Sequence, residues 1–228
     1  DNVMTYRLVV KEIAFKHGVY ATFMPKPLAD HNGSGMHVNM SLFRGERNAF
    51  FDAKDRLHLS KTAKQFMAGI LRHAPELTLV LNQWVNSYKR LVPGYEAPVY
   101  VTWAQRNRSD LVRIPMYKPG KEASTRIELR SPDPACNPYL AFSVILAAGL
   151  EGIEKKFELP PPTEENAATL SAAERARRSI GMLPGTIGEA IALAEGSRLL
   201  RRALGDHVYQ SFLQNKRIES DRFRRAVT

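Results

Sequence analysis

The sequence predicts an α+β fold: an antiparallel β-sheet with a polar active-site face, packed against helices and followed by a C-terminal helical segment. Two observations support this class. Strand-like and helical segments are separated along the chain, without the regular strand–helix alternation of parallel sheets. Segments 36–42 and 126–130 alternate apolar and polar residues, as strands with one buried face do. We therefore expect the chemistry on the polar face of the sheet.

In the N-terminal part, apolar residues at helical spacing behind Asp1 predict a helix over 2–17, closed by Gly18. Segment 19–26 predicts a strand, and the glycine-rich segment 30–35 predicts a loop before the polar strand at 36–42. Later segments, in order, predict helices over 59–73 and 75–84, a loop over 86–98, a strand over 99–104, the second polar strand over 126–130, and helices over 139–153, 187–204 and 208–227.

The helix over 139–153 begins after an Asn137 cap with Pro138 at its first position. Its apolar residues lie nearly all around the helix, so we expect it to be buried on every side. The proline-rich segment 159–163 marks a boundary. We expect residues 1–158 to carry the sheet and residues 159–228 to form a helical part of the same domain.

Composition narrows the class of protein. With 228 residues, 44% of them hydrophobic, the chain is long enough for one large core. It has no run of about 18 apolar residues and no signal peptide, so we expect a cytoplasmic protein without a membrane partner. The single cysteine, Cys136, excludes an internal disulfide. The chain begins at Asp1 without a methionine, which predicts a fragment of a longer protein.

The net charge of +10 is compatible with nucleic acid, an anionic small molecule or an acidic partner region as the ligand. The arginines do not form one dense tract, and aromatic residues are not interleaved with them as a stacking surface requires. We therefore expect no nucleic-acid partner.

The two polar strand faces carry the candidate functional residues, which are His37, Asn39 and Ser41 on one strand and Arg126, Glu128 and Arg130 on the other. One interpretation is a pair of solvated strands with cross-strand ion pairs. The other is a metal-ligating carboxylate flanked by arginines that bind anions. A lone histidine such as His37 is more often structural than a ligand. Magnesium or manganese takes roughly six mostly oxygen ligands, so a complete metal site needs further acids from outside this chain.

Several short motifs follow one another in a specific order: ATFMPKP at 21–27, NGSGMH at 32–37, NSYKRLVPGYEAP at 86–98, NRS at 107–109, RIELRSPDP at 126–134 and NPYL at 137–140. In this combination they resemble the C-terminal part of the catalytic domain of bacterial-type, class I-like glutamine synthetases. The resemblance covers essentially all 228 residues, and it identifies segment 86–98 with the flexible flap of that family.

The resemblance implies a two-step ligation. The terminal phosphoryl group of ATP moves to the γ-carboxylate of glutamate, and ammonia then displaces phosphate to give glutamine. Two or more divalent ions, Mg²⁺ or Mn²⁺, organise the anions. The resemblance also implies a homo-oligomer, a dodecamer of two hexameric rings. It further implies that an N-terminal β-grasp domain and other metal carboxylates are missing from this chain, which alone is then expected to be inactive.

The roles that the resemblance implies are as follows: His37 and Glu128 ligate metal; Asn32, Gly33, Arg90 and Arg130 hold glutamate; Asn39, Ser41, Arg108, Arg113 and Arg126 lie around the nucleotide and transferred phosphate; and Glu96 and Arg108 are catalytic, with Glu96 closing the site and accepting a proton from ammonium. Asn39 stands where bacterial relatives often have histidine. Ala168 stands where some members have an adenylylated tyrosine, so we expect that control to be absent.

Two other functions stay open from the sequence. A relative that joins glutamate to a polyamine or another amine shares the ATP and glutamate contacts and differs only in its amine pocket. A non-catalytic structural or regulatory relative is the second alternative. The joint presence of Glu96, Arg108, Glu128 and Arg130 argues against it, because a scaffold needs no such arrangement of charges.

Overall fold

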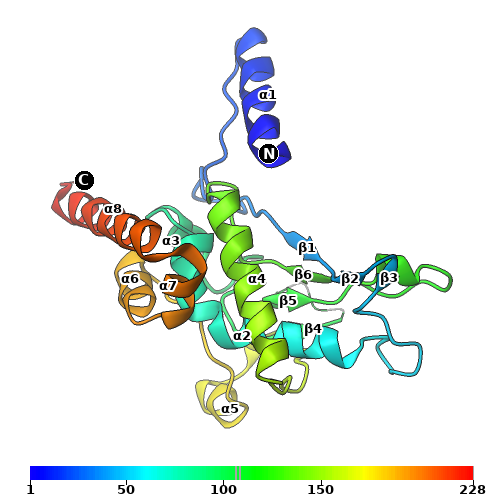
Figure 1. Cartoon of the computed structure of the whole chain (residues 1–228). Helices are drawn as coiled ribbons and strands as arrows, with labels where there is room; N and C mark the ends of the chain where they lie inside the picture. The colour runs from blue at the N-terminus through cyan, green and yellow to red at the C-terminus, as the bar shows by residue number, and fades with distance from the viewer. Residues whose placement is uncertain (106, 108, 228) are drawn as a thin grey trace.

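The computed structural model describes residues 1–105, 107 and 109–227, and confirms an α+β fold (Figure 1). The helices are α1 (Asn2–Lys16), α2 (Lys61–Leu81), α3 (Ser87–Arg90), α4 (Pro138–Glu154), α5 (Ala172–Arg177), α6 (Ile187–Glu195), α7 (Arg198–Leu204) and α8 (Asp206–Arg225), with 3₁₀ turns η1 (Glu122–Ser124) and η2 (Ala167–Thr169). The strands are β1 (Val38–Met40), β2 (Phe43–Arg44), β3 (Arg47–Asn48), β4 (Trp103–Ala104), β5 (Val112–Arg113) and β6 (Ile127–Leu129).

The main sheet has the strand order β1-β6-β5-β4. Strand β6 pairs antiparallel with both β1 and β5, whereas β4 and β5 are parallel. The register sets Glu128 on β6 opposite Asn39 on β1 and opposite Arg113 on β5. The polar strands predicted over 36–42 and 126–130 are therefore neighbours. Ile127 and Leu129 are fully buried in the core, as their alternation with charged residues predicts.

Helix α1 is confirmed, and Gly18 follows it with a φ of +70°, the left-handed conformation in which glycine ends helices. The strand predicted over 19–26 is wrong, because this segment is irregular. Pro25 has no N–H to give to a sheet. Its carbonyl instead accepts a hydrogen bond from Ser34 N at 2.8 Å and thereby fixes the glycine-rich loop.

Residues predicted to form two helices form one, α2, which continues through Pro75. It begins at Ser60, whose hydroxyl accepts a hydrogen bond from Ala63 N. Helix α2 crosses α4 closely, since a Cβ on Gly69 would lie 2.1 Å from the carbonyl oxygen of Ala148. The buried apolar face of α2 on both sides of the proline outweighs the lost hydrogen bond.

The expectation that α4 is buried all around is wrong. Its inner face packs on α2, but Tyr139, Phe142, Leu146 and Leu150 are 53%, 43%, 46% and 46% exposed and form a stripe along its outer face. Hydrophobicity all around a helix does not reveal which face the rest of the chain covers.

Other boundaries also differ from the predictions. Segment 86–98 contains the short helix α3, and only 103–104 of the segment 99–104 is a strand. The predicted helix 187–204 breaks at Gly196-Ser197 into α6 and α7, because the Ser197 hydroxyl caps α7. The hairpin β2–β3 and strand β5 were not predicted. Within the described residues, no helix combines the length and hydropathy that crossing a membrane requires.

Candidate functional site

The site is built around His37, which directly precedes β1, and Glu128 in the middle of β6. Nδ1 of His37 lies 3.1 Å from Oε1 of Glu128. The two side chains are thus on the same side of the sheet, as the strand pattern predicts. Glu128 is almost fully buried, whereas the imidazole is about one-third exposed, at 35%. The pair therefore has one edge open toward a cavity.

Two arginines surround the other oxygen of Glu128. Nε of Arg113 lies 2.5 Å from Oε2, and Nη1 of Arg130 lies 3.5 Å from it. Burial raises the pKa of the Glu128 carboxyl, but the positive charges of Arg113 and Arg130 outweigh burial and lower it. Burial, followed by the charge of Arg130, lowers the pKa of His37. The site thus holds a carboxylate beside a neutral imidazole.

A third arginine, Arg90 in α3, is buried in the wall of the site. It is only 5% exposed and donates to the carbonyl oxygens of Ser131 and Arg130, at 2.7 and 3.2 Å. The glycine-rich loop lies directly on it. A Cβ on Gly33 would lie 3.0 Å from Cγ of Arg90, and one on Gly35 would lie 2.7 Å from its Nη2. At Gly33 the nearest atom to an added Cβ is the backbone oxygen of Pro25, at 2.4 Å, so glycine is required there, whereas at Gly35 the close atom is the end of the Arg90 side chain.

Arg90 borders a cavity of about 200 Å³. The residues that line this cavity are Lys26, Asn32, Gly33, Gly35, His37, Arg90, Tyr95, Glu96, Ala97 and Arg130. The structure therefore brings together six of the predicted site residues: Asn32, Gly33, His37, Arg90, Glu96 and Arg130. Three cations and one carboxylate line the cavity beside His37. This charge balance favours anionic ligands such as carboxylates and phosphates.

The residues predicted around a nucleotide are less tightly grouped. Arg113 contacts Glu128, and Nε of Arg126 donates to Oδ1 of Asn39 at 2.9 Å. Ser41 does not reach the cavity of the site and lines a separate, mainly apolar cavity of about 300 Å³ beside α4. Arg108 lies outside the described residues.

Sequence reasoning missed Lys26 and Tyr95 as site residues. Both line the cavity, and Nζ of Lys26 lies 4.3 Å from the centroid of the Tyr95 ring. Lys26 belongs to the motif at 21–27 and Tyr95 to the motif at 86–98. Membership in these motifs was the only sequence feature that could have identified them. Neither residue type is a usual ligand of magnesium or manganese.

His37 and Glu128 offer one nitrogen and one carboxylate donor to a divalent ion. A carboxylate oxygen has more than one lone pair, so Oε2 of Glu128 can accept a further bond although it already lies 2.5 Å from Nε of Arg113. In the described part of the chain, however, no group of three or more His, Cys, Asp or Glu side chains could hold a metal. The pair fits part of a metal shell, because hard divalent ions take roughly six ligands.

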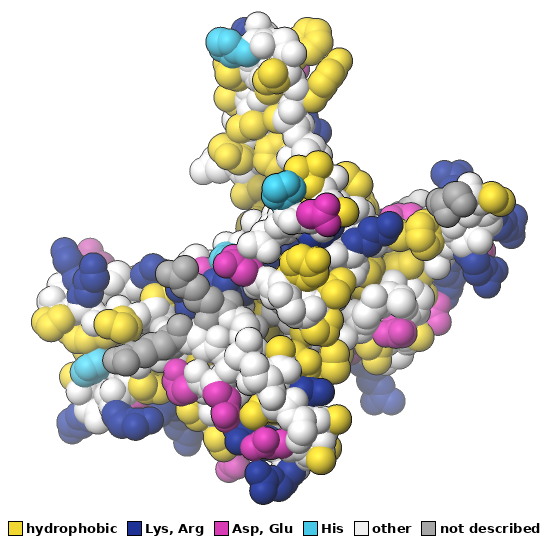
Figure 2. Space-filling view, turned by 180° about the vertical axis from the view of Figure 1, so that it is seen from behind, with side chains coloured by type: hydrophobic (Ala, Val, Ile, Leu, Met, Phe, Trp, Pro, Cys, Tyr) yellow, Lys and Arg dark blue, Asp and Glu magenta, His cyan; other side chains and the backbone are white. Residues whose placement is uncertain are grey.

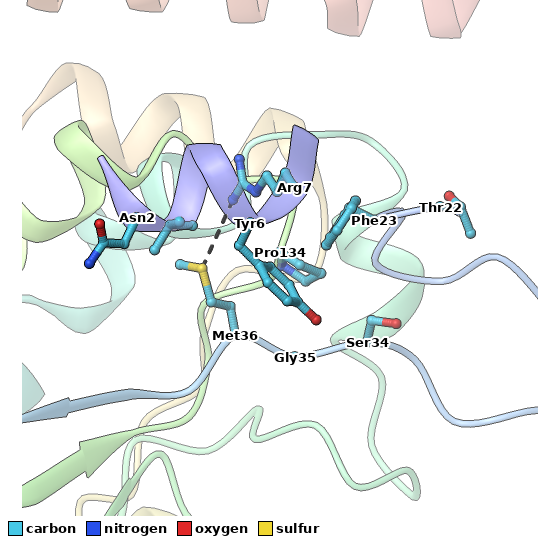
Figure 3. Close-up of a pocket in the computed structure, with 10 residues that line it drawn as sticks. Asn2, Tyr6, Arg7, Thr22, Phe23, Ser34, Gly35, Met36 and Pro134 are labelled. Atoms are coloured by element: carbon cyan, nitrogen blue, oxygen red, sulfur yellow. Dashed lines mark hydrogen bonds between the residues drawn. The ribbon is translucent and has the colours of Figure 1, made fainter. Parts of the chain in front are cut away.

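A larger cavity, of about 530 Å³, lies between α1 and the segment 22–36 (Figure 3). Its walls are mostly apolar, with Tyr6, Phe23 and Met36 facing it. Of the described residues that line it, Arg7 alone is charged, and this arginine already donates to the carbonyl of Cys136 at 2.9 Å. Of these two cavities, the smaller one, lined by Lys26, Arg90 and Arg130, is better suited to anions.

Outside the site, several charged side chains are paired with side chains of opposite charge. On the face in Figure 2, Lys and Arg side chains lie in separate groups with Asp and Glu between them. Several form ion pairs, such as Arg178 with Glu174 at 2.7 Å and Arg217 with Glu195 at 2.7 Å.

Comparisons with known proteins agree with this geometry. The family model "Glutamine synthetase, catalytic domain" matches residues 1–228. The chain is 55% identical to a glutamine synthetase of Mycolicibacterium smegmatis and 51% identical to one of Staphylococcus epidermidis, over all 228 residues. It spans 51% and 50% of these relatives, about half of their length. A solved structure of a GmaS/ADP complex matches with a TM-score of 0.88 and 35% identity, over 100% of this chain and 51% of that one. The chain therefore belongs to the glutamine synthetase family, and all of its residues match the model of the catalytic domain.

Proposed function

We propose that the protein containing this chain is a glutamine synthetase, which ligates ammonia to the γ-carboxylate of L-glutamate with ATP. The observation that carries the proposal is the cavity in which Arg90, Arg130, Glu96 and His37 converge beside Glu128. Family membership supports it. In the first step a glutamate oxygen attacks the γ-phosphorus of ATP and releases ADP. In the second, ammonia attacks the acyl carbon and phosphate leaves.

Glutamate is proposed to bind through Arg90, Arg130, Asn32 and Gly33. A guanidinium fork holds a carboxylate with paired hydrogen bonds, and both arginines are fixed by burial before any ligand arrives. Such fixed positive charge costs little reorganisation during the reaction.

The nucleotide and the transferred phosphoryl group are proposed to lie toward Arg113, Arg126, Asn39, Ser41 and Arg108. Phosphoryl transfer depends on positioning and on neutralising charge that is spread over several oxygens, which explains why arginines outnumber nucleophiles here. The ADP complex of GmaS, to which the chain is similar, supports a nucleotide site in this fold.

His37 and Glu128 are proposed to hold a divalent ion, Mg²⁺ or Mn²⁺, together with acids from the rest of the protein. A bound divalent ion supplies neutralisation of phosphate charge. The low pKa of Glu128 keeps this carboxylate ionised, as a metal ligand must be.

Glu96 is proposed to close the cavity and to accept a proton from the ammonium ion, so that neutral ammonia attacks the acyl carbon. It is exposed on the loop between α3 and β4 and lines the cavity next to Tyr95. An acyl phosphate reacts with water, so a loop that covers it protects the intermediate.

The test is an assay of the complete protein for glutamine formation from glutamate, ammonia and ATP. We expect Glu96→Gln to lower kcat by about 10²–10⁴-fold, because it removes a general base. The matched control is Glu158→Gln, which changes an exposed carboxylate far from the cavity in sequence. A complete protein that forms no glutamine, or equal effects of the two substitutions, would contradict the proposal.

The alternative is a γ-glutamyl-amine ligase of the same family, and the structural match to GmaS is the observation that favours it. Assays of the complete protein with ammonia, putrescine and ethanolamine separate the two functions. If none of the three amines is turned over, the result would instead point to a non-catalytic relative. Light scattering would test the proposed assembly of two hexameric rings.

A further inference from the structure

Lys26 lies in the wall of the candidate site and meets the flap loop through its ammonium group. Nζ of Lys26 is 4.3 Å from the centroid of the Tyr95 ring, within the range of a cation–π interaction. Tyr95 is followed by Glu96, and all three residues line the same cavity. Contact between Lys26 and the ring therefore bears directly on where Glu96 lies.

The main chain of Lys26 is fixed by Asn86. Its N–H donates to Oδ1 of Asn86 at 2.8 Å, and its carbonyl accepts from Nδ2 at 2.9 Å. Asn86 also immediately precedes α3, the helix that carries Arg90. Nζ of Lys26 donates to the carbonyl of His31. Within the described residues, no carboxylate forms an ion pair with this ammonium, so its charge is directed at the ring and the carbonyl.

The loop that bears Tyr95 packs on the core through Ala97 but has little main-chain support. No backbone–backbone hydrogen bond holds residues 93–97 in the part of the chain that is described. Tyr95 is 46% exposed, and Gly94 before it has a φ of +95°, which lets the chain turn there. A loop of this kind opens at low energetic cost unless a side-chain contact restrains it.

We propose that Lys26 is a positioning residue for the reaction: its ammonium holds the Tyr95 ring and so keeps Glu96 and the flap over the cavity. This inference rests on the proposed function. When the flap opens after phosphoryl transfer, water attacks the acyl carbon of γ-glutamyl phosphate, phosphate leaves and glutamate is regenerated. ATP is then consumed without glutamine. Loss of the contact should therefore appear as uncoupling.

The experiment measures the ratio of phosphate released to glutamine formed in the complete enzyme. Lys26→Met and Tyr95→Leu remove the cation or the ring, and we expect each to raise the uncoupled fraction by about 2- to 30-fold, the range for a cation–π contact. Tyr95→Phe and Lys26→Arg keep the interaction, so both variants should stay coupled like the wild type. Lys89→Met, which removes an exposed lysine from α3, is the matched control and should stay coupled.

A second measurement does not depend on turnover. Hydrogen–deuterium exchange of the Leu91 and Val92 amides, which donate to the carbonyls of Ser87 and Arg90 at the start of the loop, should accelerate in Lys26→Met and Tyr95→Leu in the unliganded complete enzyme. The factor should be similar in both variants and no larger in the double variant, because both substitutions break one contact. Tyr95→Phe should exchange like the wild type. Unchanged melting temperatures would show that the variants are folded.

The outcomes separate the two proposals. Wild-type enzyme that makes glutamine, with variants that stay coupled and exchange normally, would overturn the role of Lys26 and leave the proposed function intact. Tyr95→Phe behaving like Tyr95→Leu would also overturn it, since the phenol hydroxyl would then be the important group. If wild-type enzyme makes no glutamine, the proposed function fails, and faster exchange in the variants would still support the contact.

Discussion

Asp110 is a fully buried carboxyl group that the proposed reaction does not use. It lies between β4 and β5, and its Oδ1 accepts a hydrogen bond from the hydroxyl of Thr102. Among the described residues, its Oδ2 has no hydrogen-bond partner. Burial raises the pKa of Asp110 to about 7. The hydrogen bond from Thr102 opposes this rise, and the negative charge of Glu164 increases it. The ionised form is therefore unfavourable in the folded state.

We expect Asp110→Asn to stabilise the chain at neutral and higher pH. Folding raises the pKa of this carboxyl from about 4 to about 7. The free energy of unfolding therefore falls as the pH rises through this interval, and above about pH 7 it falls no further. Because the amide NH2 that replaces Oδ2 is itself buried without a partner among the described residues, the gain should be only about 1–2 kcal/mol, or about 2–6 °C in Tm. Melting curves at pH 5 and pH 8 should show a larger difference at pH 8. An equal difference at both values would contradict this account.

The candidate site could be predicted from the sequence where residue type and strand alternation carry the information. His37 and Glu128 fall on the polar faces of two strands, and the structure brings them within 3.1 Å. Ser41 satisfies the same alternation but, together with Asn39, lines a separate apolar cavity beside α4, which the alternation does not predict. Asp110 could not be singled out, since its burial comes from tertiary packing that no local pattern contains.

At the scale of elements, the crossing of α2 and α4 forms the centre of the core. Gly69 and Gly152 face each other there: a Cβ on Gly152 would lie 2.2 Å from the carbonyl oxygen of Gln65 and 2.7 Å from Gly69 N. The colliding atoms belong to the backbone and cannot move aside without separating the helices. These glycines are therefore required by packing, despite their cost within a helix.

We expect Gly152→Ala to destabilise the chain by about 3 kcal/mol or more, because an added methyl group overpacks a backbone contact. The matched control is Gly188→Ala in α6, where the nearest atom to an added Cβ is 3.9 Å away. That change should be neutral or stabilise by about 0.5–1 kcal/mol through helix propensity. Denaturant or thermal unfolding measures both. A Gly152→Ala variant as stable as the wild type would show that the helices can separate without cost.

Helices and strands were predictable where a local signal and the tertiary environment agree. The caps at Gly18 and Asn137 fix the end of α1 and the start of α4 as expected. Pro75 is a strong local signal for a helix end, yet packing of α2 overrides it. Segment 19–26 has the composition of a strand but finds no neighbouring strand in the described residues, and composition does not encode pairing.

At the scale of the whole molecule, large apolar surfaces remain uncovered. Helix α1 stands away from the rest of the chain in Figure 1, and hydrophobic side chains are visible over it in Figure 2. None of its residues is buried. The stripe along α4 adds a second such surface. Exposed apolar area of this extent is typical of interaction surfaces, so we expect the 228-residue chain alone to self-associate.

The isolated 228-residue chain should also bind divalent ions weakly and form no glutamine. His37 and Glu128 are two donors, and an Mg²⁺ or Mn²⁺ site requires roughly six, of which several are carboxylates in a tight site. Calorimetry with Mn²⁺ should therefore give little heat for the chain and a clear isotherm for the complete protein. Glu128→Gln in the complete protein should weaken that isotherm, whereas Glu158→Gln should not. Tight Mn²⁺ binding or turnover by the isolated chain would mean that its own residues complete the site.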